Sequence, residues 1–306
     1  MSLLMLTGRK TRIVLNEDLR LVVQGRDGRS LWESSGSRLP TAVVRQTGGV
    51  PRSIQLGAAQ EVSLSACADG PYQGQVVHLT GFEDADVGID LILALDSDGD
   101  ELLIQAGQTG GADTLVGVNH LYRFEKPVRD GGYLVLPHGS GYLIPADCPD
   151  PLPGAGEAGG VIGARWTLPL FGMVRGRDAL CAMVETWWDC DVAADHLPGD
   201  CSALDFNWAP SLGEFAYPRR QRIRFAENMD HASMAQLYRE RARRDGLVRP
   251  LEEKADATPL IRRYVENVLF RWPAWNPDEA PAVLADIRRL RAAGLGVNFF
   301  YPKWSS

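Results

Sequence analysis

The sequence predicts a mainly β protein that ends in a short α/β segment. Up to about residue 225 the chain consists of short β-like runs separated by turn residues, and no convincing helix of more than three turns interrupts them. After Asp230 the apolar residues recur with a helical period. Residues 268–301 then read as strand, helix and strand, which is the pattern of a parallel crossover unit. Together these observations predict a large antiparallel sandwich followed by an incomplete α/β region.

The β-like runs are rich in apolar and β-branched residues, with alternation in several of them. They cover residues 12–15, 19–23, 41–45, 61–65, 75–79, 89–95, 101–104, 166–174, 178–188 and 219–225. In the last run, strict alternation predicts that Arg220, Arg222 and Arg224 face solvent. Many short strands at this spacing are typical of a sandwich or barrel, and their number over more than 200 residues indicates a large one.

Turn residues separate these runs. Residues 26–29, 96–100 and 130–132 contain Asp-Gly pairs and are predicted to form hairpin turns, because glycine tolerates positive φ. A calcium loop is the alternative for residues 96–100. The EF-hand pattern needs glycine at its sixth position and a bidentate glutamate at its twelfth. Here Gly99 is fourth and Gly107 occupies the twelfth position, so the sequence favours the hairpin.

The first clear helix is predicted over residues 231–244. Asp230 precedes it as an N-cap, and Gly246 follows its last turn as a terminator. Met234 and Leu237 lie on one face of this helix, which is therefore expected to pack against the β domain.

The crossover unit has clear start and stop signals. Residues 268–272 and 297–301 are short, apolar and aromatic enough for strands. Between them, Asn276 is an N-cap, Pro277 stands at the first helical position and Gly294 ends the helix. Two parallel strands and one helix leave apolar faces without neighbours. We therefore expect this region to be unstable or to self-associate unless it docks on the sandwich.

Composition excludes several classes of protein. Of the 306 residues 45% are hydrophobic and 23% are charged, values typical of a soluble globular chain. A net charge of −7 argues against a general nucleic-acid-binding protein. No run approaches a membrane span, and the brief apolar start precedes its basic residues, in the opposite order to a signal peptide. The five scattered cysteines do not form a disulfide pattern, so we expect a cytoplasmic protein.

Two segments contain the residue types of a cofactor or metal motif but lack its structural context or spacing. Gly154–Gly159 fits G-x-G-x-x-G, but it follows a Pro-rich loop and leads into Val161 instead of a helix. Asp189-Cys-Asp191 with His196 offers ligand types without the spacing of a zinc site. We therefore expect no cofactor and no metal ion.

Trp187, Trp188 and Asp189 form the most informative cluster before residue 225. Two large aromatic rings beside a carboxylate can stack on the apolar face of a sugar while the carboxylate binds its hydroxyl groups. The alternative is that both tryptophans pack between the two sheets or domains. The sequence leaves both interpretations open.

The chain resembles the front half of certain glycoside hydrolases in which a galactose-mutarotase-like β-supersandwich precedes a (β/α)8 barrel. Families 101 and 129, of the α-N-acetylgalactosaminidase type, and uncharacterised bacterial relatives have this order. The resemblance is carried by Leu31-Trp-Glu-Ser34, residues 133–141, residues 168–172, residues 178–185 and the helix-to-strand passage from Val283 to Trp304.

This resemblance implies three parts: a β-supersandwich over residues 1–225, a helical linker over 226–258 and the start of a truncated barrel over 259–306. Barrel active sites form at the C-terminal ends of the strands. The expected sugar-contacting residues there are Trp272, Trp275, Tyr301, Lys303 and Trp304. Glycoside hydrolysis needs two carboxylates, which in such barrels come from later strands. The resemblance thus implies that the catalytic residues lie beyond Ser306 and that the fragment alone is inactive.

Three functions remain open from the sequence. The first is the N-terminal portion of a glycoside hydrolase acting on α-linked sugars. The second is a non-catalytic carbohydrate-binding or structural module. The third is an aldose epimerase, which needs a histidine acid and a carboxylate base facing each other; His78, His120, His138 and Glu185 are available by type. The expected partner is an oligosaccharide or glycoconjugate, with no nucleic acid or membrane and with self-association through the incomplete barrel.

Overall fold

The computed structural model contains two compact units, Met1–Tyr238 and Arg239–Ser306. It describes residues 2–36, 38–149, 166–196, 200–265, 267–271 and 277–300. Among these residues, no helix is both long and apolar enough to cross a membrane. The predicted division at residues 225 and 258 remains a prediction.

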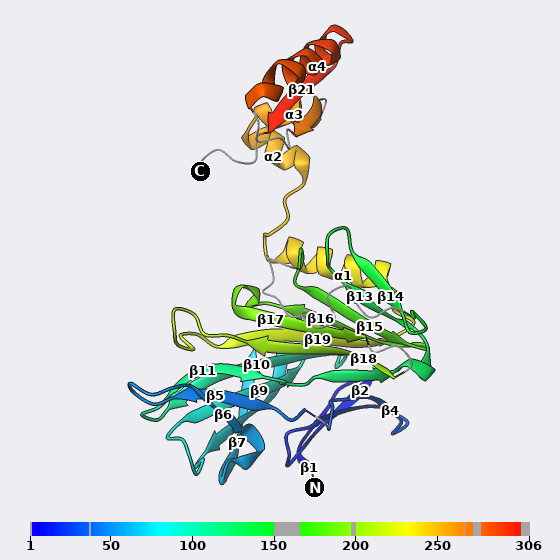
Figure 1. Ribbon diagram of the computed structural model, residues 1–306. Coiled ribbons are helices and arrows are strands. Elements are labelled where there is room, and N and C mark those ends of the chain that lie inside the picture. The colour runs from blue at the N-terminus through cyan, green and yellow to red at the C-terminus, as the bar shows by residue number, and fades with distance from the viewer. Residues whose placement is uncertain are drawn as a thin grey trace. The chain divides into compact units, whose positions relative to one another are not determined.

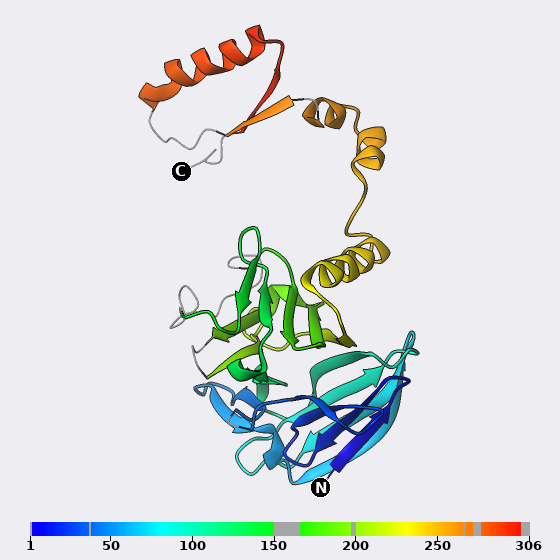
Figure 2. The ribbon, with the colours of Figure 1, turned by 90° about the vertical axis from the view of Figure 1, so that its right-hand side faces the viewer.

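The first unit is built from antiparallel sheets (Figures 1 and 2). Within the described residues a four-stranded meander comes first, with β1 (Ser2–Thr7), β2 (Thr11–Asn16), β3 (Leu21–Gly25) and β4 (Ser30–Glu33). A large sheet follows, nine strands wide in the described part of the chain, in the order β14 (Tyr142–Pro145), β13 (Tyr133–Leu136), β15 (Leu170–Arg175), β16 (Asp178–Val184), β19 (Arg219–Glu227), β10 (Glu101–Gly110), β9 (Gly88–Leu95), β8 (Tyr72–Thr80) and β7 (Glu61–Asp69).

A six-stranded sheet, counted over the described residues, forms the opposing layer. Its order is β12 (Phe124–Pro127), β18 (Cys201–Trp208), β11 (Thr114–Asn119), β5 (Thr41–Arg45) and β6 (Arg52–Gln55), and β17 (Cys190–His196) also pairs with β18. Short 3-10 turns join the strands: η1 (Leu56–Ala58), η2 (Val128–Asp130) and η3 (Trp187–Asp189). The predicted mainly β sandwich is therefore confirmed.

The main core forms where the inward faces of the three sheets meet. Leu91 and Ile104 come from the large sheet, Phe206 from the six-stranded sheet and Trp32 from the meander, and all four are almost fully buried. Phe206 contacts Phe171 edge to face, with ring centroids 5.8 Å apart. The alternating apolar residues noted in the sequence supply these inward faces.

Helix α1 (His231–Arg244) packs on the outer face of the large sheet (Figure 1). Its predicted N-cap is confirmed, because Asp230 Oδ1 accepts the Ser233 N–H at 2.8 Å. Met234 is fully buried against β15 and β16, and a Cβ at Gly172 would collide with its sulfur atom. The predicted apolar face of this helix thus forms a second, smaller core.

Two local predictions were wrong. Gly131 and Gly132 do adopt positive φ, but no hairpin forms there. β12 belongs to the six-stranded sheet and β13 to the large one, so this turn carries the chain between sheets. Arg222 was expected to face solvent, yet it is only 5% exposed. It lies on a central strand, stacks on the Tyr72 ring at 4.4 Å and forms an ion pair with Glu185.

The second unit contains the predicted strand, helix and strand. β20 (Asn267–Arg271) and β21 (Gly296–Phe300) pair in parallel, and α4 (Ala280–Ala292) lies between them in sequence, preceded by η4 (Pro277–Glu279). Two short helices come before β20, namely α2 (Leu251–Ala257) and α3 (Leu260–Val265). Gly294 ends α4 with a positive φ, as predicted. The predicted cap Asn276 lies outside the described residues.

Candidate functional site

Trp187 and Trp188 lie on the surface, at the connection between the two large sheets. The sequence suggested a strand over residues 178–188, but β16 ends at Val184 and the chain turns through η3 before entering β17. This turn moves both rings out of the sheet, and they are 38% and 51% exposed. Their centroids are 5.7 Å apart in an edge-to-face arrangement. This exposure excludes packing between the sheets, whereas packing between domains stays a prediction.

Tyr217 extends this aromatic surface. Its ring centroid lies 6.1 Å from that of Trp188, and the ring is half-buried. Tyr217 comes from the connection between β18 and β19, which the sequence analysis did not single out. We call Trp187, Trp188 and Tyr217 the aromatic platform. No pattern in the sequence signals the third ring, because residues nearly thirty positions apart meet only in the folded sheet.

A buried arginine fixes the platform from below. Arg219 is completely buried, and its guanidinium lies 3.8 Å from the centroid of the Tyr217 ring and 4.3 Å from that of Phe215. It donates hydrogen bonds of 2.9 Å to the carbonyl oxygens of Tyr217 and Ala209. Its Nη2 atom also lies 3.3 Å from Asp189 Oδ2. The cation thus joins the η3 turn to the β18–β19 connection and limits movement of the rings.

Asp189 presents a carboxylate beside the platform. Its Oδ2 atom accepts the Tyr217 hydroxyl and faces Arg219. Burial and this hydrogen bond to Asp189 raise the pKa of Tyr217 to about 12, so the phenol remains a donor at neutral pH. Burial lowers the pKa of Arg219. Oδ1 of Asp189 makes no hydrogen bond within the described residues, which leaves one acceptor for a ligand hydroxyl.

A shallow depression adjoins the platform. It has a volume of about 360 Å³ and is lined mainly by apolar groups, including Val43, Trp208, Ala209 and Pro210. Ala209 is the residue whose carbonyl binds Arg219. The volume is within the range of roughly 300–1,000 Å³ that small-ligand sites occupy. The platform residues and Asp189 do not line this depression, which connects to them only through Ala209.

The expected sugar-contacting residues of the second unit lie outside the described residues. These are Trp272, Trp275, Tyr301, Lys303 and Trp304. Gly154–Gly159, the weak dinucleotide motif, lies outside them as well. Their assignment to a barrel active site therefore stays a prediction.

The structure does not assemble the residues considered for an epimerase. His78 binds Asp90 at 2.7 Å, and His120 binds the buried Asp205 at 2.7 Å. His138 stacks on Tyr142 with centroids 5.0 Å apart, whereas Glu185 pairs with Arg222. Each candidate has its own structural partner. These contacts thus give no support for a histidine and a carboxylate that face each other across a ligand.

His78 belongs to a hydrogen-bonded chain that sequence spacing could not reveal. Its Nε2 atom lies 2.7 Å from Ser65 Oγ, while Nδ1 contacts Asp90. The three residues come from the adjacent strands β7, β8 and β9 and meet through cross-strand register. Because β7 is an edge strand and Ser65 is exposed, the chain is open to water. We interpret it as cross-strand stabilisation of the sheet edge.

Asp96, Asp98 and Asp100 form the one acidic cluster of metal-site dimensions in the described part of the chain, with carboxylate oxygens within 4.8 Å of one another. The predicted hairpin is confirmed, because β9 and β10 pair on either side of this turn. Asp100 Oδ2 already forms ion pairs of 2.9 Å with Lys10 and 3.0 Å with Arg224. These two cations neutralise Asp100 and disfavour a further cation beside it.

The sandwich and the α/β segment that follows it have counterparts in solved structures. No family model and no curated protein matches the chain. Similar solved structures include the α-N-acetylgalactosaminidase NagBb from Bifidobacterium bifidum. Its complex with Gal-NHAc-DNJ gives a TM-score of 0.80 with 20% identity over 99% of this chain, and its complex with GalNAc gives 0.78 with 20% identity over 99%.

The chain spans about half of the length of this structural neighbour, 52% in both complexes. At 20% identity the likeness shows the fold alone. The chain therefore has the β-sandwich fold that forms the N-terminal part of a glycoside hydrolase.

Proposed function

We propose that the chain is the N-terminal portion of a glycoside hydrolase that acts on α-linked sugars, with its catalytic carboxylates supplied by sequence beyond Ser306. The observation that carries this proposal is the likeness of 99% of the chain to half of an α-N-acetylgalactosaminidase. The parallel pairing of β20 and β21 supports it, since a parallel pair separated by a helix is the repeating unit of a (β/α)8 barrel.

The sandwich itself contributes sugar recognition in this proposal. Trp187 and Trp188 offer exposed rings to the apolar face of a pyranose, and Asp189 Oδ1 is free to accept a hydroxyl. Asp189 is suited to binding more than to catalysis. Its Oδ2 atom is already held by the Tyr217 hydroxyl and by Arg219, so this carboxylate acts as a fixed acceptor.

The decisive experiment extends the reading frame beyond Ser306 and assays the longer protein on an aryl α-N-acetylgalactosaminide and on other aryl α-glycosides. The expected result is hydrolysis by the longer protein and none by the 306-residue chain. Release of aryl alcohol by the chain alone would contradict the assignment of the carboxylates to later sequence. A longer protein that hydrolyses no α-glycoside would overturn the proposed activity.

A non-catalytic carbohydrate-binding module is the second candidate, favoured by the exposure of the two tryptophans. This function predicts retention of the 306-residue chain on immobilised glycans, with a dissociation constant raised about two- to tenfold by Trp188→Ala. Tyr142→Ala is the matched control, because Tyr142 is also an exposed aromatic but contacts His138 instead of the platform. Equal loss of retention in both variants would exclude a specific role for the platform.

A further inference from the structure

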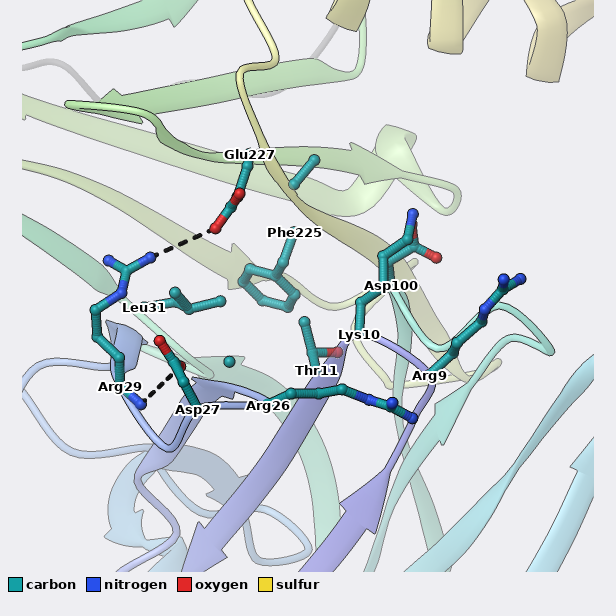
Figure 3. A pocket seen from close by; sticks show the side chains of 12 residues that line it. Arg9, Lys10, Thr11, Arg26, Asp27, Arg29, Leu31, Asp100, Phe225 and Glu227 are labelled. Carbon is teal, nitrogen blue, oxygen red and sulfur yellow. Dashed lines mark hydrogen bonds and ion pairs between the residues drawn. The ribbon is translucent and has the colours of Figure 1, made fainter.

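A second cavity lies in the first unit, apart from the aromatic platform. Three turns and one strand enclose it: the β1–β2 turn, the β3–β4 turn, the β9–β10 turn and the end of β19. Its volume is about 550 Å³, and it shares no lining residue with the platform or its adjoining depression. Figure 3 shows the side chains that surround it.

The floor of the cavity is apolar. Phe225 and Leu31 are both largely buried, and in Figure 3 the Phe225 ring and the Leu31 side chain lie in the middle of the lining. An aromatic ring with a branched aliphatic group beside it can contact the C–H face of a ring-shaped ligand. The apolar floor therefore sets a preference for a ligand with one non-polar face.

Basic side chains predominate around the rim. The lining contains Arg9, Lys10, Arg26 and Arg29 against Asp27, Asp100 and Glu227, so four positive groups face three negative ones. The whole chain, by contrast, carries a net charge of −7. Arg29 is also paired with Asp178, which does not line the cavity. The positive charge left for a ligand is therefore that of Arg9 and Arg26, and unpaired cations attract anions from solution.

Two of these cations are already engaged by buried acids. Arg29 forms a bidentate ion pair with Asp178, with distances of 2.6 and 3.0 Å. This hydrogen bond to Asp178 raises the pKa of Arg29. Lys10 lies 2.9 Å from Asp100. These pairs hold the walls of the cavity in position and leave little of their charge for a ligand.

Arg9 and Arg26 remain available. Neither forms an ion pair or a side-chain hydrogen bond within the described residues, and both are exposed. In Figure 3 they extend toward the same side of the cavity, away from Arg29. A guanidinium group presents paired N–H donors that match the two oxygens of a carboxylate or sulfate. Two unpaired guanidinium groups at one side of a cavity with an apolar floor are an arrangement that suits a ringed anion.

We propose that this cavity binds an anionic sugar, one that carries a carboxylate or a sulfate ester. Arg9 and Arg26 bind the anionic group, Phe225 and Leu31 contact the ring, and the exposed carboxylates of Asp27 and Glu227 accept ring hydroxyls. The site is independent of hydrolysis, and it adds recognition of charge to the proposed recognition of neutral sugar surface by the platform.

Calorimetry on the 306-residue chain tests this proposal with four probes: methyl glucuronide, N-acetylglucosamine 6-sulfate, methyl glucoside and inorganic sulfate. The expected result is that at least one charged sugar binds ten times more tightly than methyl glucoside and inorganic sulfate. Raising the salt concentration from 50 to 500 mM should weaken that binding severalfold. The stronger of the two charged sugars identifies the anionic group.

Arg9→Gln and Arg26→Gln are each expected to weaken binding of the charged sugar at least fivefold. Arg12→Gln is the matched control, because Arg12 is an exposed arginine on β2 that does not line the cavity. Circular dichroism melting checks that all three variants fold. Equal binding of methyl glucoside, binding of sulfate as tight as that of the sugars, binding unaffected by both Arg9→Gln and Arg26→Gln, or no binding at about 20 mM would each overturn the proposal.

Discussion

The two units of this protein contain similar apolar residues but differ in how far these residues are buried. In the first unit, the inward faces of three sheets meet, and residues such as Leu91 and Phe206 are completely buried. In the second, β20 and β21 pair with each other, and α4 has no buried residue among those described. Leu284 and Leu295 there remain 50% and 44% exposed.

This difference shows that a segment can form regular secondary structure without forming a hydrophobic core. The second unit has a well-formed strand, helix and strand, because glycine stops and β-branched residues act locally. A core needs opposed layers, which the sandwich has and two parallel strands do not provide. We propose that the apolar faces of the second unit are covered by further barrel sequence or by self-association.

The largest expected difference concerns truncation of apolar side chains. Phe206→Ala in the sandwich should lower the free energy of unfolding by about 3–5 kcal/mol, because it opens a cavity in a closed core. Leu284→Ala on α4 should lower it by less than about 1 kcal/mol, since half of that side chain is exposed. Urea denaturation followed by circular dichroism measures both. Similar losses would mean that α4 is buried in solution.

Loss of an ion pair should also lower the free energy of unfolding more in the first unit than in the second. Asp189→Asn leaves the buried Arg219 without its anion and is expected to cost about 2 kcal/mol. Asp256→Asn in the second unit removes a 2.7 Å pair with Arg262 in which both side chains are about 70% exposed (69% and 71%). Its expected cost is within about 0.5 kcal/mol. Denaturant titration of both variants measures these costs, and a larger loss of stability for Asp256→Asn than for Asp189→Asn would contradict the expectation.

Protease sensitivity should separate the units without any substitution. Cleavage after residue 258 is expected to be at least ten times faster than cleavage within the sandwich strands, because local opening exposes little buried surface there. Limited trypsin digestion followed by mass spectrometry locates the cuts, and Arg262, Arg288 and Arg291 provide sites. Equal protection of residues 259–306 would show that their apolar faces are covered.

The smallest expected effect is on acid stability. The Arg29 hydrogen bond holds the pKa of Asp178 below its ordinary value of 3.8. A lowered pKa stabilises the fold above the unfolded value, and this contribution disappears as the pH falls through the folded value. Arg29→Gln should therefore lower the free energy of unfolding by about 1 kcal/mol or less at pH 7. Below about pH 4 the free energy of unfolding of this variant should fall less steeply with decreasing pH than that of the unsubstituted protein.

Arg289→Gln provides the counterpart of the Arg29 variant in α4. Arg289 pairs with Asp286 on the exposed helix surface, where the side chains are 79% and 46% exposed. No change in the pH dependence of unfolding is expected for that variant. If the free energy of unfolding fell less steeply at low pH in both variants, the exposed pair would contribute as much as the half-buried one.

Much of the fold followed from local patterns. Alternation of apolar residues located strands such as β5 and β9, and capping signals located α1 with its exact limits. The parallel pairing of β20 with β21 followed from the helix between them. Local patterns were insufficient where the chain passes between sheets, as at Gly131 and Gly132, because a positive φ permits a turn without specifying which strands it joins.

The candidate sites were predictable only in part. Trp187, Trp188 and Asp189 are adjacent in sequence, so their chemistry could be noticed as a group. Their exposure depended on β16 ending at Val184, which no turn signal marked. The sequence contains no signal for the cavity that we propose binds an anionic sugar. Its arginines lie in turns, and these turns meet residues of β19 only after the sheets have packed.

The sequence by itself located many of the strands and helices, because propensity, periodicity and capping act over a few residues, but local patterns did not mark β11, β17 or β18. The tertiary structure alone decided which arginines are buried, which tryptophans face solvent and which turns enclose a cavity. Arg222 alternates with Arg220 and Arg224 in one strand and was expected to face solvent as they do, yet it is buried against the Tyr72 ring. Burial depends on what the neighbouring strands and turns supply, and those neighbours come from distant parts of the chain.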